Sequence, residues 1–204
     1  MDSVFRRRRA AVTSIDQGID QGIDRGSERS HESDDSPRAR RLIVVAGSID
    51  EWAAFSEAQW TDRLTTVGSA AAAAGVVSVR IVPSAGGRAG RREIGERHAR
   101  VEGCDVVADP RPDGRSNVVD AVNKMSRPIT EQSLQAQIGG SSGDVDLVIV
   151  LGELNVLPQA LVWELAYAEL VYIAADWSDL SSEHIRRSLE EFAVRQRRFG
   201  GVIE

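Results

Sequence analysis

Cysteine is almost absent from this chain of 204 residues, in which Cys104 stands alone. One thiol cannot form an internal disulfide, so the sequence is not built for an oxidising compartment. The chain also lacks the run of about 20 apolar residues that a membrane-spanning helix needs. Four arginines at 6–9 open the sequence, but no apolar signal core follows them. These absences predict a cytoplasmic protein.

Excess positive charge is absent too. The formal net charge is −6, which excludes a protein that grips nucleic acid through an overall basic surface. The three histidines, at 31, 98 and 184, are scattered without the spacing of a metal site. We therefore expect no nucleic-acid partner.

The first 40 residues differ from the rest of the chain. They contain three Ile-Asp-x-Gly repeats at 15–26 and a dense run of charges, with aromatic residues nearly absent. Such a segment cannot bury enough apolar surface to offset the loss of chain entropy. We predict a disordered charged tail over 1–40 and a folded domain over 41–204. The arginines at 6–9 beside Phe5 can touch anionic lipid heads at the inner face of a membrane, or the whole tail is simply solvated.

The folded part alternates short apolar runs with helical segments. Alternation of this kind favours an α/β fold with a mainly parallel central sheet flanked by helices. Residues 83–97, rich in Gly and Arg, predict a loop with a short helix. We expect strands at 42–45, 76–82, 104–108, 146–151 and 171–174, and helices at 56–74, 117–125, 130–138, 157–170 and 181–197.

Four motifs follow one another in the last third of the chain. They are DLVI at 146–149, LVWELAYAEL at 161–170, DWSDL at 176–180 and RQRRFGG at 195–201. In order and spacing they resemble the C-terminal signature of the cis-prenyltransferase (undecaprenyl diphosphate synthase) family. GRSNVV at 114–119 and Trp52-Ala53 are weaker upstream similarities. The resemblance implies a shortened cis-prenyltransferase fold from residue 41 to the C-terminus.

The same resemblance implies that this chain's own substrate pocket is dismantled. The family holds its diphosphates and Mg²⁺ with an Asp after the first strand and with two Arg and a Ser near the DLVI strand. The side chains that this sequence has at those positions cannot form the charge-assisted hydrogen bonds of the family residues, each worth roughly 1.5–3 kcal/mol. Residues 84–101 are also too short and too polar to wall a tunnel for a long lipid. The lost positions are Gly47, Val150, Val156 and Pro158, and the first motif's Arg position holds Glu51.

Residues that serve a neighbouring subunit are retained. In the family the basic tail reaches across the dimer to the partner's diphosphate, and a Glu near the interface helps to position Mg²⁺. Arginine guanidinium groups beside a glycine, which lets the backbone approach a phosphate closely, form a suitable anion-binding site. The residues implied for the tail are Arg195, Arg197, Arg198 and Gly200, and the residue implied for the metal is Glu169.

The pattern resembles the non-catalytic subunit of heteromeric cis-prenyltransferases, the class typified by the Nogo-B receptor. It implies a pseudoenzyme of isoprenoid biosynthesis that is inactive alone and supports polyprenyl diphosphate synthesis by a catalytic partner, which holds the Mg²⁺.

Alternative readings of the same residues stay open. One is a homodimeric transferase acting on a short isoprenoid diphosphate, with Asp50, Glu153 and Glu169 holding metal. The other is an interaction protein that has lost all prenyl chemistry. Gly114-Arg115 either binds phosphate or caps a helix.

Overall fold

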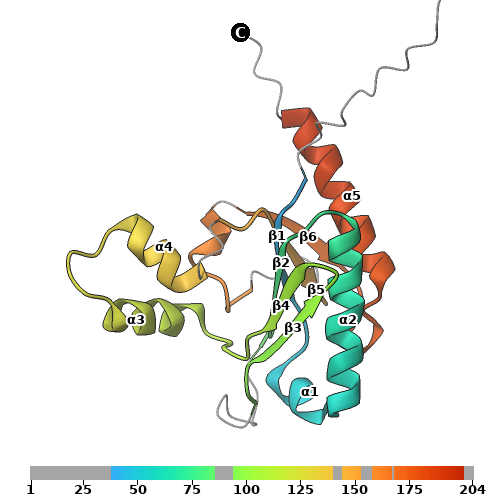
Figure 1. Cartoon of the computed structure of the whole chain (residues 1–204), viewed down its shortest axis with the longest axis horizontal. Coiled ribbons are helices and arrows are strands. Elements are labelled where there is room, and N and C mark those ends of the chain that lie inside the picture. Colours follow the sequence, from blue (N-terminus) through green and yellow to red (C-terminus); the bar gives the residue numbers. More distant parts are fainter. Residues whose placement is uncertain (1–37, 86–93, 140–143, 153–157, 167, 200–204) are drawn as a thin grey trace, which may run out of the picture. The chain divides into compact units, whose positions relative to one another are not determined.

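One central sheet of six strands organises the domain (Figure 1). The computed structural model describes residues 38–85, 94–139, 144–152, 158–166 and 168–199, and for 196–199 it describes the backbone alone. The strand order is β3-β4-β2-β1-β5-β6, and every neighbouring pair is parallel except β3 with β4. The predicted mainly parallel α/β fold is thus confirmed. The strands are β1 (Arg41–Val45), β2 (Ser78–Val82), β3 (Arg97–Val101), β4 (Cys104–Ala108), β5 (Leu147–Leu151) and β6 (Glu169–Ile173).

The middle strands are apolar because helices or loops cover both faces of the sheet. Val44 of β1 lies between Ile81 of β2 and Ile149 of β5, and all three are fully buried. Uninterrupted apolar runs are typical of parallel strands covered on both sides.

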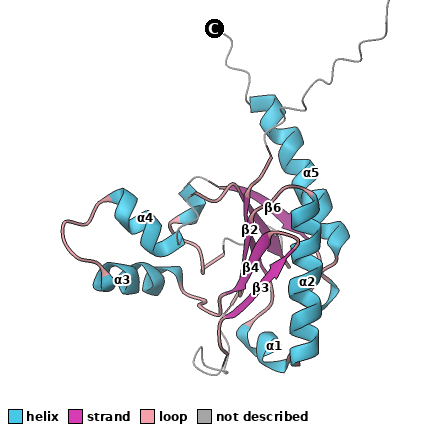
Figure 2. Ribbon diagram, in the orientation of Figure 1, coloured by secondary structure: helices cyan, strands magenta, loops and turns pink. Residues whose placement is uncertain are grey.

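The two faces are covered differently (Figure 2). One face packs against α2 and α5 over the larger core, which includes Trp52, Trp60 and Trp177. The other face carries a smaller apolar cluster beneath residues 158–165, beside α3 and α4. The helices are α1 (Ile49–Ala54), α2 (Glu57–Ala73), α3 (Gly114–Lys124), α4 (Glu131–Gly139) and α5 (Ser182–Phe199), with 3-10 turns η2 (Glu164–Ala166) and η3 (Trp177–Asp179).

Helix α2 packs very closely on β3 and β4. A Cβ added at Gly68 would lie 2.7 Å from Cβ of Val101 and 3.0 Å from Val106. At this point the helix and the sheet touch with no space between them.

The predicted helix at 157–170 is wrong over its described part. A 3-10 turn covers Glu164–Ala166, and the chain is already extended at Glu169, where β6 begins. The segment is apolar on all sides, so periodicity could not separate a helix from a buried strand. Pairing with β5, from Leu147 opposite Glu169 to Leu151 opposite Ile173, decides the outcome.

Strand β3 was not predicted, because its sequence RHARV is rich in charge. It forms a hairpin with β4 through Glu102 and Gly103, both with positive φ (49° and 89°). Two such residues in a row make the tight turn that suits paired strands, so the Glu-Gly pair was the available signal. The loop expected at 83–97 lies mostly outside the described residues.

Among the described residues, no helix is both long and apolar enough to cross a bilayer. The tail over 1–40 lies outside the described part of the chain except for its last three residues, and it stays a prediction.

Candidate functional site at the carboxyl edge of the sheet

The carboxyl ends of the parallel strands form the edge where open α/β sheets bind their ligands. Strands β1 and β5 end there at Val45 and Leu151, so Gly47 and Val150 both lie at this edge. Both positions thus lie at the ligand-binding edge, Val150 in the smaller apolar cluster on one face of the sheet and Gly47 against Trp177 of the larger core on the other.

Gly47 is held in a conformation and a space that suit glycine. Its φ is +68°, and an added Cβ would lie 2.9 Å from Cγ of Trp177. Its carbonyl accepts hydrogen bonds from both the backbone N–H (2.7 Å) and the hydroxyl (2.9 Å) of Ser84. The indole of Trp177 thus fills the space that a carboxylate side chain at this position would enter.

Trp177 belongs to an aromatic cluster that closes the edge. Its ring lies 5.5 Å from Phe55 in a stacked arrangement, 5.9 Å from Trp60 and 6.1 Å from Trp52. Trp177 is only 2% exposed. Large rings packed at these separations bury much apolar area and favour each other's faces and edges. These four rings form a buried hydrophobic cluster, which disfavours a charged diphosphate.

Arg63, a residue of α2, holds Trp177 of this aromatic cluster in place. Its guanidinium lies 4.8 Å from the Trp177 ring centroid and donates to the carbonyls of Ser178 (3.0 Å) and Leu180. Burial lowers the pKa of Arg63 from its ordinary value, although the carbonyls and the ring face still favour a cation. Arg63 is therefore engaged in fixing η3.

Glu51, at the motif's Arg position, also has a structural task. Its carboxylate accepts from the Ser48 N–H (2.7 Å) and hydroxyl (2.9 Å), while its own N–H donates to the Ser48 hydroxyl (3.2 Å). This reciprocal capping box starts α1.

The second half of the pocket is apolar as well. Val150 is 5% exposed and packs in the smaller cluster with Val45, Ala160 and Leu161. Pro158 is buried and lines a groove of about 590 Å³, in which apolar side chains of 161–165 lie beside the charged residues Asp113 and Arg115. Val156 lies outside the described residues. At Val150, an Arg would put an unpaired charge into an apolar cluster, which is costly.

The structure shows a helix cap at Gly114-Arg115, and phosphate binding by the Arg115 side chain stays a prediction. The Asp113 carboxylate accepts from the backbone N–H groups of Arg115 (3.0 Å) and Ser116 (3.4 Å), and the Gly114 N–H donates to the Gln159 carbonyl (2.9 Å). The Ser116 hydroxyl and these N–H groups hold the pKa of Asp113 below its usual range. The first N–H groups of α3 are therefore occupied and do not face a phosphate.

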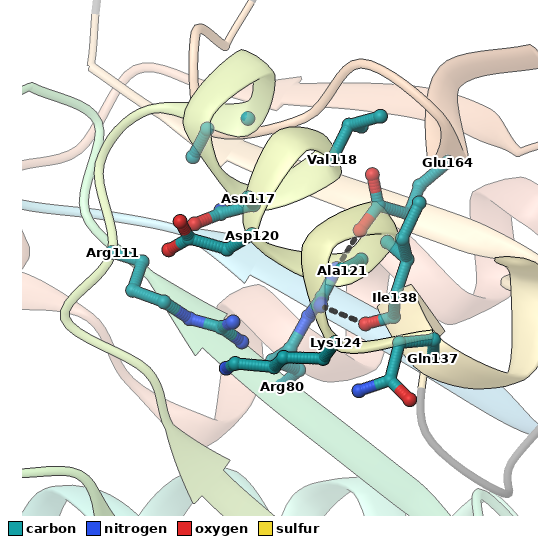
Figure 3. A pocket seen from close by; sticks show the side chains of 12 residues that line it. Arg80, Arg111, Asn117, Val118, Asp120, Ala121, Lys124, Gln137, Ile138 and Glu164 are labelled. Atoms are coloured by element: carbon teal, nitrogen blue, oxygen red, sulfur yellow. Dashed lines mark hydrogen bonds and ion pairs between the residues drawn. The ribbon is translucent and has the colours of Figure 1, made fainter. Parts of the chain in front are cut away.

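Motif reasoning missed a polar cluster between the sheet and α3 and α4 (Figure 3). Arg80 of β2 forms an ion pair with Glu164 and donates to the Ile138 carbonyl (3.4 Å), while Arg111 is paired with Asp109. The cavity beside them holds about 20 Å³, enough for roughly one water. The signal was an Arg inside the strand SVRIV and a Glu inside an apolar motif.

The tail residues can be placed only in part. Arg195 donates from Nη1 to the Leu170 carbonyl at 2.8 Å and pairs with Glu191 on its own helix. Arg197 and Arg198 belong to α5, with only their backbone described, and Gly200 lies outside the described residues. Their role at a partner's site stays a prediction.

The carboxylates proposed for a metal are not brought together. Asp50 follows β1 at the carboxyl edge, whereas Glu169 starts β6 at the opposite edge. Five residues of strand separate these edges by roughly 15 Å, and Glu153 is not described. No group of three or more His, Cys, Asp or Glu among the described residues could hold a metal ion. The described side chains do not fit a Mg²⁺ site in this chain's own pocket, and Glu169 as a metal ligand toward a partner stays a prediction.

The model of the family described as putative undecaprenyl diphosphate synthase matches residues 95–200, more than half of the chain. The chain belongs to the cis-prenyltransferase (undecaprenyl diphosphate synthase) family. The matched part of this cis-prenyltransferase chain runs from just before β3 to the tail, and Gly47 lies outside it.

Individual relatives agree over the same kind of span. An isoprenyl transferase of Fusobacterium nucleatum is 36% identical over 93 residues, which cover 43% of this chain and 40% of the relative. A ditrans,polycis-undecaprenyl-diphosphate synthase of Photorhabdus laumondii, described as (2E,6E)-farnesyl-diphosphate specific, is 32% identical over 101 residues, 44% of this chain and 40% of the relative. The matched part of the chain thus spans about two fifths of the length of these relatives. A probable undecaprenyl diphosphate synthase of Campylobacter jejuni superposes with a TM-score of 0.49 at 12% identity, covering 81% of this chain and all of the other.

Proposed function

We propose that this chain is the non-catalytic subunit of a heteromeric cis-prenyltransferase. It pairs with a complete catalytic chain and donates its Arg-rich tail, through Arg197, Arg198 and Gly200, to the partner's diphosphate site, where Mg²⁺ is held. The product of the complex is a polyprenyl diphosphate.

The observation that carries the proposal is the contact between Gly47 and Trp177. A diphosphate needs cations and a metal-holding carboxylate where its charge develops. Here Gly47, two residues after β1, has no side chain and an indole occupies the adjoining space. Entry of a carboxylate or a diphosphate would require displacement of a ring that four aromatic and cationic neighbours hold.

The second half of the pocket supports the same proposal. Val150 lies in an apolar cluster and Pro158 has no charged side chain, so neither position supplies a positive charge, although Arg115 lines the groove beside Pro158. The basic tail motif, by contrast, is intact in the sequence and lies within the family match up to Gly200. A chain that keeps the basic tail but has lost the charged residues of its own substrate pocket is suited to bind the diphosphate in another chain's pocket.

Reconstitution tests this proposal. The catalytic prenyltransferase encoded in the same genome is purified alone, this chain is purified alone, and the two are mixed with isopentenyl diphosphate, farnesyl diphosphate and Mg²⁺. We expect no product from this chain, little from the partner and strong incorporation by the mixture. Arg198→Ala should abolish most of that gain.

Arg187→Ala is the matched control, because Arg187 is an exposed arginine of the same helix away from the tail. It should leave the gain intact. The proposal is overturned if the partner alone is as active as the mixture, or if Arg198→Ala and Arg187→Ala behave alike.

A further inference from the structure

We propose that Arg195 is a positioning residue that clamps the end of α5 to the outer edge of β6 and so fixes the direction in which the basic tail leaves the domain. This inference rests on the proposed function, and it gives Arg195 a different task from the diphosphate-binding role that the resemblance implies.

The clamp has two partners on different elements. Nη1 of Arg195 donates to the carbonyl of Leu170, the second residue of β6, at 2.8 Å. Nη2 pairs with the carboxylate of Glu191, four residues earlier on α5. A planar guanidinium whose two terminal nitrogens are both bound has a fixed orientation. A lysine ammonium on a flexible stem does not reproduce it.

The Leu170 carbonyl is available because it faces away from the sheet. In the described part of the chain, β6 is the edge strand of the sheet and pairs with β5 alone. The Glu169 N–H donates to the Asp146 carbonyl, and the Ile173 carbonyl accepts from the Gly152 N–H. The backbone polar groups of Glu169 and Ile173 therefore face β5. Because these groups alternate in direction along a strand, the Leu170 carbonyl faces away from the sheet. Arg195 satisfies an edge carbonyl without competing with the ladder.

Among the side chains of α5 that the structure describes, up to Arg195, Phe192 is the last that is buried in the core. Ile185, Leu189 and Phe192 are buried against the core, but Val194 is 50% exposed. The helix continues for seven residues past Phe192, about 10 Å, and Figure 1 shows these last turns running past the strands. Beyond Phe192, the contact between Arg195 and Leu170 joins the helix to the sheet.

Two substitutions separate a clamp from a ligand. Arg195→Lys keeps the positive charge and loses the two-ended fork. Glu191→Gln removes a negative charge beside the tail, which would favour a diphosphate if Arg195 were its ligand. If Arg195 is a clamp, both substitutions loosen the end of α5. Glu190→Gln is the control, since Glu190 is an exposed acid of the same helix that pairs with Arg186.

Hydrogen exchange on the purified full chain gives a readout independent of activity. We expect the amides after Phe192 to exchange on the order of tenfold faster in Arg195→Lys and Glu191→Gln, with those of 185–192 unchanged. Glu190→Gln should match wild type throughout. Equal exchange in all four proteins overturns the clamp.

The reconstituted complex gives the second readout. A tail that is correctly placed for a smaller fraction of the time lowers apparent affinity by that fraction. Arg195→Lys and Glu191→Gln should therefore raise KM for isopentenyl diphosphate several-fold while kcat stays near wild type. If both variants keep the wild-type KM although Arg198→Ala is impaired, the clamp fails and the proposed function stands. If Arg198→Ala is itself without effect, the proposed function fails, and hydrogen exchange alone decides the clamp.

Discussion

The indole of Trp177 lies so close to Gly47 that a Cβ at that position would approach the ring to 2.9 Å. Gly47 follows the first strand, at the edge where the family's chemistry takes place, and Trp177 comes from a turn 130 residues later. Trp177 belongs to the DWSDL motif, so the departure from the family pattern lies at Gly47, which offers no charged side chain where the indole packs against it.

Replacement of Gly47 tests the contact directly. Gly47→Ala places a methyl group against Trp177 at a positive φ, so we expect a loss of about 2–4 kcal/mol of unfolding free energy from strain and overpacking together. Urea denaturation measures this loss.

Gly75→Ala is the matched control for that experiment. Gly75 also has a positive φ (85°), but nothing lies within 4 Å of its added Cβ. It should lose about 1 kcal/mol for conformation alone. Equal losses at the two positions would mean that Trp177 does not close the space.

The buried pair of Arg80 and Glu164 should behave as a unit. Their side chains are 20% and 6% exposed and join β2 to η2. Removal of one partner leaves a charge without its counterion, so Arg80→Met and Glu164→Leu should each cost about 3 kcal/mol or more. The double variant should lose clearly less than the sum, as chemical denaturation of all four proteins would show.

The exposed pair of Arg186 and Glu190 provides the comparison. Its double-mutant cycle should show little measurable coupling, because water and salt screen exposed charges. If the losses of unfolding free energy at Arg80 and Glu164 were also additive, the ion pair would not couple β2 to η2.

Cys104 should be unreactive in the folded protein. Burial raises the pKa of its thiol to about 11, and the thiolate is the reactive form. At pH 8, an alkylating reagent should modify the native chain very slowly and the urea-unfolded chain quickly, as mass spectrometry would show.

The same shift has a stability consequence. The folded pKa is above the unfolded value of about 8.5, so the contribution of the neutral thiol is complete below that pH. It is lost as the pH rises from there toward 11. Fast alkylation of the native protein at pH 8, independent of urea, would contradict the burial of Cys104.

Local patterns predicted much of the fold. The short apolar runs at 42–45 and 146–151 were correctly predicted as strands, and the serine, alanine and glycine signals around 56–75 set the limits of α2. Residues 164–170 could not be predicted in this way. Their sequence suits a helix or a strand, and the choice between η2 and β6 comes from pairing with β5.

The candidate site shows the same division. The resemblance identified Gly47 and Val150 as positions where charge is missing. It could not indicate what replaces the charge, because Trp177 is distant in sequence and meets Gly47 only through the packing of η3, which Arg63 of α2 contacts, on the sheet. Arg195 was identified by its motif, but its contact with Leu170 depends on where α5 crosses the edge of β6.

If the pocket of this chain is closed, the chain cannot hold a diphosphate by itself. Calorimetric titration of the purified chain with isopentenyl diphosphate and with farnesyl diphosphate, each with Mg²⁺, measures this. We expect no saturable heat up to millimolar ligand. Magnesium-dependent binding of one diphosphate per chain at micromolar concentration would contradict it.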